Sequence, residues 1–281
     1  NDNNKNIDYL IIIHSGGEAA YTGNLTDMWA HVWEINPTLR NGFIFQYYAM
    51  LSEYMELPTD QQRIGVDCHE MGHLLGLADL YDYTELSNGV GKYSLMSHGS
   101  WGNAGITPVQ LDAFSKYELG YTNTLVNQNG LLSLSNAEVS NINYLYTTQN
   151  PSEYFMLENR QKTLYDEFLP ASGLFIWRIN DFKYSNNDES CFRVTLLQAD
   201  GQRHLENSIN LGDAGDPFPG STLNTSFNKI TNPNTKLCNN IFPTIDLDIS
   251  NISTSSNIIT FNASLIEQIP CILPTCTFTV T

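Results

Sequence analysis

The feature that most constrains this chain is the stretch "CHEMGHLLGLADLYDY", which covers residues 68–83. It places two histidines four positions apart and a glutamate directly after the first histidine. On a helix with 3.6 residues per turn, His69 and His73 lie one turn apart on one face, and Glu70 projects beside them. The sequence therefore predicts a helix over residues 60–75 that presents two imidazoles and a carboxylate on one side.

The opposite face of this predicted helix is apolar. Its members follow one another at spacings of four, three and four residues: Ile64, Cys68, Met71 and Leu75. Such spacing is typical of the buried side of an amphipathic helix. We therefore expect this stripe to face the core and the imidazoles to lie on the other side.

Two histidines at positions i and i+4, with glutamate at i+1, form the H-E-x-x-H pattern of zinc-binding helices. Gly76 follows the helical segment and can adopt a positive φ, so the chain can turn there and bring Asp79 back toward the histidines. A catalytic zinc has three protein ligands and one open position, and imidazole nitrogens and carboxylate oxygens are suitable donors. The predicted zinc ligands are His69, His73 and Asp79.

A bound zinc would give Glu70 a role. Zinc lowers the pKa of a bound water toward neutrality, and a neighbouring carboxylate can accept the proton and pass it to a leaving amine. The predicted chemistry is therefore hydrolysis of an amide bond, with Glu70 as the general base. Two alternatives stay open, namely a zinc site without catalysis and a chance occurrence of the pattern.

The texture of the sequence changes near residue 125. Before it, helix and strand signals are mixed, and after it short alternating segments are separated by Asn, Ser, Gly and Pro. This predicts an α+β fold with a catalytic domain over residues 1–125 and an antiparallel β-sandwich over residues 126–281. In the first domain we expect two strands and three helices: strands over 8–14 and 42–49, and helices over 25–33, 60–75 and 107–120.

The helix over residues 107–120 has the clearest boundary signals. Thr107 is its expected N-cap, Pro108 takes the first helical position and Gln110 completes a capping box. Gly120 follows its end. We therefore expect the helix to start directly after Thr107.

The charge and hydropathy of the chain exclude some functions. A formal net charge of −17 argues against nucleic-acid binding, which needs a positive surface. The longest apolar run, residues 9–13, is too short to cross a bilayer. An acidic surface suits an extracellular protein that binds calcium, and plain solubility is the alternative. In "LGDAGDPFPG", Asp213 and Asp216 offer carboxylates for Ca²⁺, with an ordinary turn as the alternative.

Five cysteines suit one or two disulfides in a secreted protein. Four of them cluster in the second half of the chain. We expect Cys191 to pair with Cys238 and Cys271 with Cys276. Cys68 would then be a buried free thiol.

Charged residues also lie among the strand signals of residues 157–181. Glu158 can pair with Arg160, and Asp166 can pair with Arg178. Separately solvated charges are the alternative.

The zinc pattern resembles that of the metzincin clan, in which a methionine-containing turn underlies the metal. Met96 follows Asp79 by seventeen residues and matches the turn methionine. Beyond the motif, the chain is similar to the immune inhibitor A family of secreted metallopeptidases. The similarity is carried by these stretches: "DYLIIIHSG" with "MWAHVW", "HEMGHLLGLADLYD", "YSLMSHGSWG", "EYFMLENRQK" with "LPASGLFIWRIND", and "GDAGDPFPGS".

This resemblance implies a zinc endopeptidase that is secreted with an inhibitory pro-segment as a zymogen. It also implies a β-sandwich after the catalytic domain, and calcium sites. His98 stands two residues after Met96, where several metzincin branches carry a tyrosine, so it is a candidate donor to the oxyanion. A surface histidine in a glycine-rich loop is the alternative. Metzincin domains usually begin with a strand and a helix upstream of the strand over residues 8–14, so that part is absent from this chain or the branch is compact.

The sequence therefore predicts a secreted zinc endopeptidase that hydrolyses internal bonds of extracellular proteins or peptides. One rival is a non-catalytic binding protein, such as an adhesin, that keeps zinc for folding. A second rival is a zinc hydrolase that acts on a non-peptide amide.

Overall fold

The computed structural model describes residues 5–238 and 245–266, and its fold is α+β with more sheet than helix. No helix in these two ranges is long and apolar enough to cross a membrane. The elements in chain order are β1 (Leu10–His14), α1 (Ala19–Thr22), β2 (His31–Arg40), β3 (Phe43–Ser52), α2 (Ile64–Leu74), η1 (Gly91–Tyr93), η2 (His98–Gly105), α3 (Ala113–Glu118), β4 (Asn123–Val126), β5 (Gly130–Ser135), α4 (Ala137–Ser140), β6 (Ile142–Thr147), β7 (Glu153–Arg160), η3 (Leu164–Phe168), β8 (Gly173–Asn180), β9 (Val194–Leu196), β10 (Leu247–Ser250) and β11 (Ile258–Leu265).

The N-terminal sheet has the order β1-β3-β2, with β1 parallel and β2 antiparallel to β3. Both predicted strands are present, but the helix predicted over residues 25–33 is wrong. Residues 25–27 form a turn, Met28 forms an isolated bridge with Glu18, and β2 begins at His31. The buried carboxylate of Glu18 accepts hydrogen bonds from the backbone nitrogens of Ala20 and Ala30. These bonds hold the end of this stretch next to α1, in a non-helical conformation.

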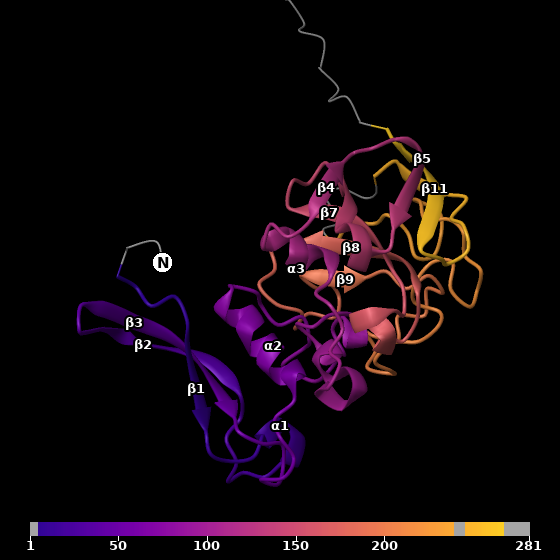
Figure 1. Cartoon of the computed structure of the whole chain (residues 1–281). Coiled ribbons are helices and arrows are strands. Elements are labelled where there is room, and N and C mark those ends of the chain that lie inside the picture. Colours follow the sequence, from indigo (N-terminus) through magenta and orange to yellow (C-terminus); the bar gives the residue numbers. More distant parts are fainter. Residues whose placement is uncertain (1–4, 239–244, 267–281) are drawn as a thin grey trace, which may run out of the picture.

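Helix α2 lies between the N-terminal sheet and the C-terminal sheets (Figure 1). The prediction that its apolar stripe is buried is wrong, because Ile64 is 56% exposed and Met71 is 46% exposed. The buried face is the one that carries the histidines, and two glycines explain why. A Cβ on Gly65 would lie 2.0 Å from a backbone oxygen of η2, and a Cβ on Gly72 would lie 2.4 Å from the sulfur of Met96. Glycine at these positions lets the helix approach that segment closely.

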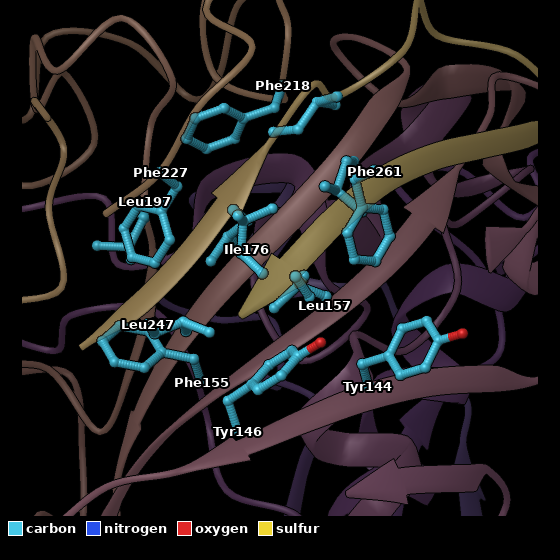
Figure 2. Packing of buried hydrophobic residues seen from close by; sticks show 14 of the residues in the cluster. Tyr144, Tyr146, Phe155, Leu157, Ile176, Leu197, Phe218, Phe227, Leu247 and Phe261 are labelled. Carbon is cyan, nitrogen blue, oxygen red and sulfur yellow. The ribbon is translucent and has the colours of Figure 1, made fainter. Parts of the chain in front are cut away.

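The C-terminal part contains a five-stranded sheet of order β4-β6-β7-β8-β9 and a three-stranded sheet of order β10-β11-β5. Side chains from both sheets share one apolar core, in which Leu157 and Ile176 of the larger sheet meet Phe261 of the smaller one (Figure 2). The alternate side chains of β7 and β8 point to the other face of the larger sheet. There Met156 and Trp177 pack in a second core with Met96.

Helix α3 starts at Ala113 with Asp112 as its N-cap, so the predicted N-cap at Thr107 is wrong. The Asp112 carboxylate accepts hydrogen bonds from the backbone nitrogen and the hydroxyl of Ser115. The residues before it are not helical, and Val109 donates its backbone N–H to the Gly99 carbonyl, 3.0 Å away. Pairing with the loop that follows Met96 therefore outweighs the local capping signals.

The remaining predictions concern ion pairs and cysteines. The buried guanidinium of Arg160 lies 2.6 Å from Asp166 and 3.8 Å from Glu158, so the pairing of Glu158 with Arg160 is confirmed and that of Asp166 with Arg178 is wrong. The predicted disulfide between Cys191 and Cys238 is confirmed. Cys68 is a free thiol but half-buried rather than buried, and Cys271 and Cys276 lie outside the described residues.

Candidate metal centre

The two histidines of α2 face each other with their rings at right angles. Their ring centres are 4.8 Å apart and their Nε2 atoms are 3.2 Å apart. The Nδ1 atom of His69 lies 2.8 Å from the carbonyl oxygen of Leu95, and that of His73 lies 2.9 Å from the carbonyl oxygen of Leu77. These bonds assign a proton to each Nδ1, so Nε2 is the ring atom of each histidine that can give its lone pair to a metal.

Asp79 returns to the histidines because the chain turns at Gly76, whose φ is +96°. The Oδ1 atom of Asp79 lies 2.9 Å from His69 Nε2 and 3.3 Å from His73 Nε2. At zinc–ligand distances of about 2.0–2.1 Å, the ligand atoms of a tetrahedral site lie about 3.3 Å apart. The three donor atoms therefore converge with spacings that suit one zinc ion.

Tyr83 holds the other oxygen of Asp79, to which its hydroxyl donates a short hydrogen bond. Burial raises the pKa of Asp79, but its close contacts with His69 and His73 and the hydrogen bond from Tyr83 outweigh burial and hold the pKa far below the usual range. Burial lowers the pKa of His73, while its bond to Asp79 outweighs burial and raises the pKa to about 9. The cluster thus keeps a carboxylate ionised in a largely buried place.

Glu70 lies beside the histidines and lines a cavity of about 740 Å³ together with His69. Burial raises the pKa of Glu70, and the two histidines partly oppose this shift. Tyr81, on the wall of the same cavity, stacks on His69 with ring centres 6.2 Å apart. A carboxyl group with increased proton affinity therefore faces a space next to the three donor atoms.

His98 and Met96 reach the centre from the following loop. His98 lines the same cavity, and burial lowers its pKa, so the ring is neutral at pH 7. The Met96 side chain is fully buried against Gly72, which lies between the two histidines in α2. The backbone oxygen of Met96 also accepts a hydrogen bond from Leu80, which fixes the chain just after Asp79.

Asp213 and Asp216 lie in a separate cluster that also contains Asp200 and His204. One ligand atom from each of Asp200, His204 and Asp213 falls within 4.8 Å of the others. Asp216 is buried and accepts hydrogen bonds from the Tyr93 hydroxyl and the Asp213 backbone nitrogen. Its burial raises its pKa to about 7.

Sequence reasoning missed four of these side chains. Two were visible in principle: Tyr81 and Tyr83 stand inside the quoted zinc stretch, two and four residues after Asp79. Asp200 and His204 had no signal, because the fold alone brings them to Asp213.

Comparison with known proteins agrees with the resemblance drawn from the sequence. Residues 1–130 match the family model for "Immune inhibitor A peptidase M6, catalytic domain". Over 126 residues, 39% of this chain, it is 34% identical to "Immune inhibitor A" from Bacillus thuringiensis subsp. alesti. Over 125 residues, 40% of this chain, it is 35% identical to "Pre-pro-metalloprotease PrtV" from Vibrio cholerae serotype O1.

The matches cover 18% of the Bacillus protein and 13% of the Vibrio protein. The similarity to immune inhibitor A peptidases is therefore confirmed, and it lies over the part of the chain that carries the three donor atoms.

Proposed function

We propose that this chain is a zinc-dependent endopeptidase that cuts extracellular proteins at internal peptide bonds. One observation carries the proposal: two imidazole nitrogens and one carboxylate oxygen lie within 3.3 Å of one another beside a cavity that Glu70 lines. The similarity to a family of metallopeptidases supports the same chemistry.

His69, His73 and Asp79 are the proposed zinc ligands. When bound, zinc supplies a water of lowered pKa and polarises the scissile carbonyl. The backbone carbonyls that accept from each Nδ1 keep both Nε2 lone pairs directed to one point. Tyr83 keeps Asp79 in a fixed orientation by holding its second oxygen.

Glu70 is the proposed general base, which takes a proton from the attacking water and passes it to the leaving amine. Its raised pKa brings its proton affinity closer to neutral pH, where such a transfer is most efficient. His98, neutral and on the wall of the same cavity, is the proposed donor to the developing oxyanion. Met96 is the proposed apolar floor of the site.

We also propose that residues 1–125 form a metzincin-like catalytic domain and residues 126–281 a β-sandwich. Secretion fits the disulfide, because such bonds persist in oxidising compartments. An inhibitory pro-segment is a further expectation from the family. Asp213 and Asp216 are the proposed calcium ligands, and their oxygen donors suit that ion.

The test compares casein hydrolysis by the zinc-loaded wild type and Glu70→Gln. We expect at least a hundredfold loss of activity in the variant with zinc content unchanged, because only the proton carrier is removed. Asp67→Asn is the matched control: it changes a carboxylate on the same helix that does not line the cavity, and it should keep activity. Equal activity of Glu70→Gln and wild type would contradict the proposed mechanism, because the hydrolysis would not need Glu70. An inactive wild type with one zinc bound would favour the non-catalytic binding protein.

A further inference from the structure

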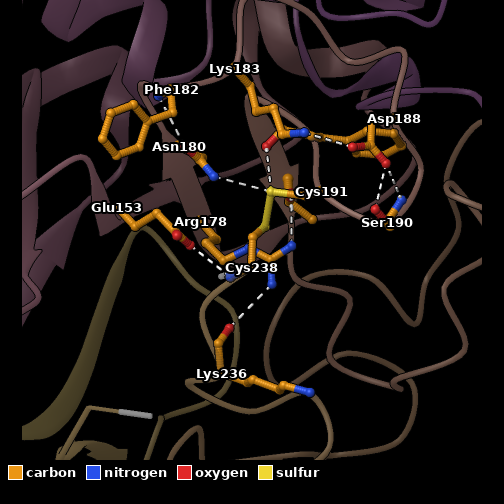
Figure 3. Close-up of a disulfide and its surroundings, with 12 residues drawn as sticks. Glu153, Arg178, Asn180, Phe182, Lys183, Asp188, Ser190, Cys191, Lys236 and Cys238 are labelled. Atoms are coloured by element: carbon orange, nitrogen blue, oxygen red, sulfur yellow. Dashed lines mark hydrogen bonds and ion pairs between the residues drawn. A yellow bond between two sulfur atoms is a disulfide. The ribbon is translucent and has the colours of Figure 1, made fainter. Parts of the chain in front are cut away.

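A second cavity, of about 450 Å³, lies in the C-terminal part of the chain, and Cys238 is among its lining residues. Figure 3 shows the disulfide between Cys238 and Cys191 with Arg178 and Lys236 near it. Three basic side chains line it, namely Arg178, Arg203 and Lys236. Glu206 is the single carboxylate among its described lining residues. This is an unusual concentration of positive charge, because the whole chain has 13 basic and 30 acidic residues.

Arg178, on β8, is the most buried of the three cations. Its Nη1 atom donates to the Lys236 carbonyl at 3.2 Å, and its Nη2 atom donates to the Thr195 hydroxyl at 3.3 Å. Both acceptors are neutral, and within the described part of the chain no ion pair joins Arg178 to a carboxylate within 4.0 Å. The carboxylate that the sequence offered it, Asp166, is bound to Arg160 instead.

The positive charge of Arg178 is only partly balanced by the carboxylates around it. Burial lowers the pKa of Arg178, and the more distant charges of Glu153 and Glu206 only partly oppose this. Burying a charge without a close counter-ion is unfavourable, and an anion that enters the cavity would remove part of that cost.

The walls of the cavity are fixed before any ligand arrives. The disulfide ties Cys238 to Cys191, so the lining segment that carries Lys236 is joined to the one that carries Ser190 (Figure 3). At the rim, Arg203 donates to the Glu189 carbonyl at 3.0 Å and lies 3.4 Å from Glu206. A preorganised site loses less conformational entropy when it binds.

We propose that this cavity binds an oxyanion, either a carboxylate or a phosphate, on a small polar ligand. Arg178 is the main contact, with Arg203 and Lys236 at the rim. The planar guanidinium suits anions that offer two oxygens, and the cavity has the size of a small-molecule site. None of the three cations lines the cavity at His69, so the site is independent of the proposed peptidase activity.

The test measures thermal unfolding and calorimetric binding of the whole chain with inorganic phosphate or with succinate, at constant ionic strength. We expect the wild-type Tm to rise with the logarithm of ligand concentration for at least one anion, and the responding anion identifies the ligand class. Arg178→Met should bind at least about tenfold more weakly, because a charge-assisted pair is lost. Without ligand this variant should be at least as stable as wild type, because an uncompensated buried charge has gone.

Rim variants and a remote control separate local from general charge effects. Arg203→Gln and Lys236→Gln should each weaken binding by about two- to threefold, as expected for exposed charges. Lys162→Gln, which removes one exposed charge outside the cavity, should leave binding unchanged. If Arg178→Met fails to fold, Arg178→Lys replaces it and should bind more weakly than wild type, since it keeps the charge but loses the planar fork.

Two results would overturn the proposal. One is a wild-type Tm that neither anion raises above the salt control. The other is wild-type affinity in the folded Arg178 variant, which would reduce the arginine to a structural role.

Discussion

Replacing Tyr83 with phenylalanine tests whether the hydrogen bond to Asp79 orients a metal ligand. The substitution removes one hydroxyl and keeps the ring, which packs edge-on against Tyr81 with centres 5.1 Å apart. Asp79 would then lose the donor on the oxygen that faces away from the histidines. Its carboxylate could rotate, so Oδ1 would no longer be held near both Nε2 atoms.

The expected loss follows from the charge of the acceptor. Hydrogen bonds to charged groups contribute about 1.5–3 kcal/mol, and 1.4 kcal/mol corresponds to a factor of ten in affinity. A bound zinc shares the carboxylate charge, so the lower end applies, and zinc should bind about tenfold more weakly. This agrees with the effect of removing outer partners of metal ligands, which is about 10–100-fold.

The assay is zinc competition against a chromophoric chelator at pH 7, with Tyr184→Phe as the control. Tyr184 is largely exposed and does not line the zinc cavity. The zinc-free proteins should melt within a few degrees of each other, which would separate ligand orientation from folding. A folded Tyr83→Phe with wild-type zinc affinity would refute the orienting role.

Three further outcomes follow. Zinc affinity should increase as the pH rises from 6.5 to about 9, because zinc must displace the proton of His73. Over the same range the zinc-free protein should lose the stabilisation that the imidazolium provides. Zinc titrations and thermal melts of the zinc-free and zinc-bound protein at several pH values check both outcomes. Gly65→Ala should be more destabilising than Gly72→Ala in thermal melts, although alanine favours a helix at both positions. The new Cβ at position 65 would lie 2.0 Å from a backbone oxygen, whereas the one at position 72 would meet the flexible side chain of Met96. Replacing Cys191 and Cys238 together by serine should lower the free energy of unfolding by about 4 kcal/mol, which is the chain-entropy value for a sequence separation of 47 residues. Denaturant unfolding measures this, and an unchanged midpoint would contradict it.

The residues of the candidate centre could be placed near one another from the sequence because they are local in the chain. His69, Glu70 and His73 share one helix, and Asp79 follows a single turn at Gly76. Helical periodicity and the conformational freedom of one glycine are enough to place them near one another.

The burial of α2 could not be predicted in the same way. The apolar stripe indicated one face, but the contacts of Gly65 and Gly72 with residues more than twenty positions later determine that the other face is buried. The N-cap of α3 failed for a related reason, since a backbone pairing with Gly99 replaced the local capping signals at Thr107. In both cases, contacts between residues distant in sequence outweighed the local signals for helix orientation and helix capping.

The candidate metal centre is supported from beyond the region that matches known peptidases. Met96 packs in one core with Met156 and Trp177 of the five-stranded sheet. Arg160, also on that sheet, donates hydrogen bonds to the backbone oxygens of Tyr93 and Gln110, on either side of the Met96 loop. A division at residue 125 remains a prediction, but the packing crosses it. Because that sheet packs against the loop that meets Gly72, we expect the spacing of the three donor atoms to depend on residues of both halves, and substitutions that destabilise the sheet should also weaken metal binding.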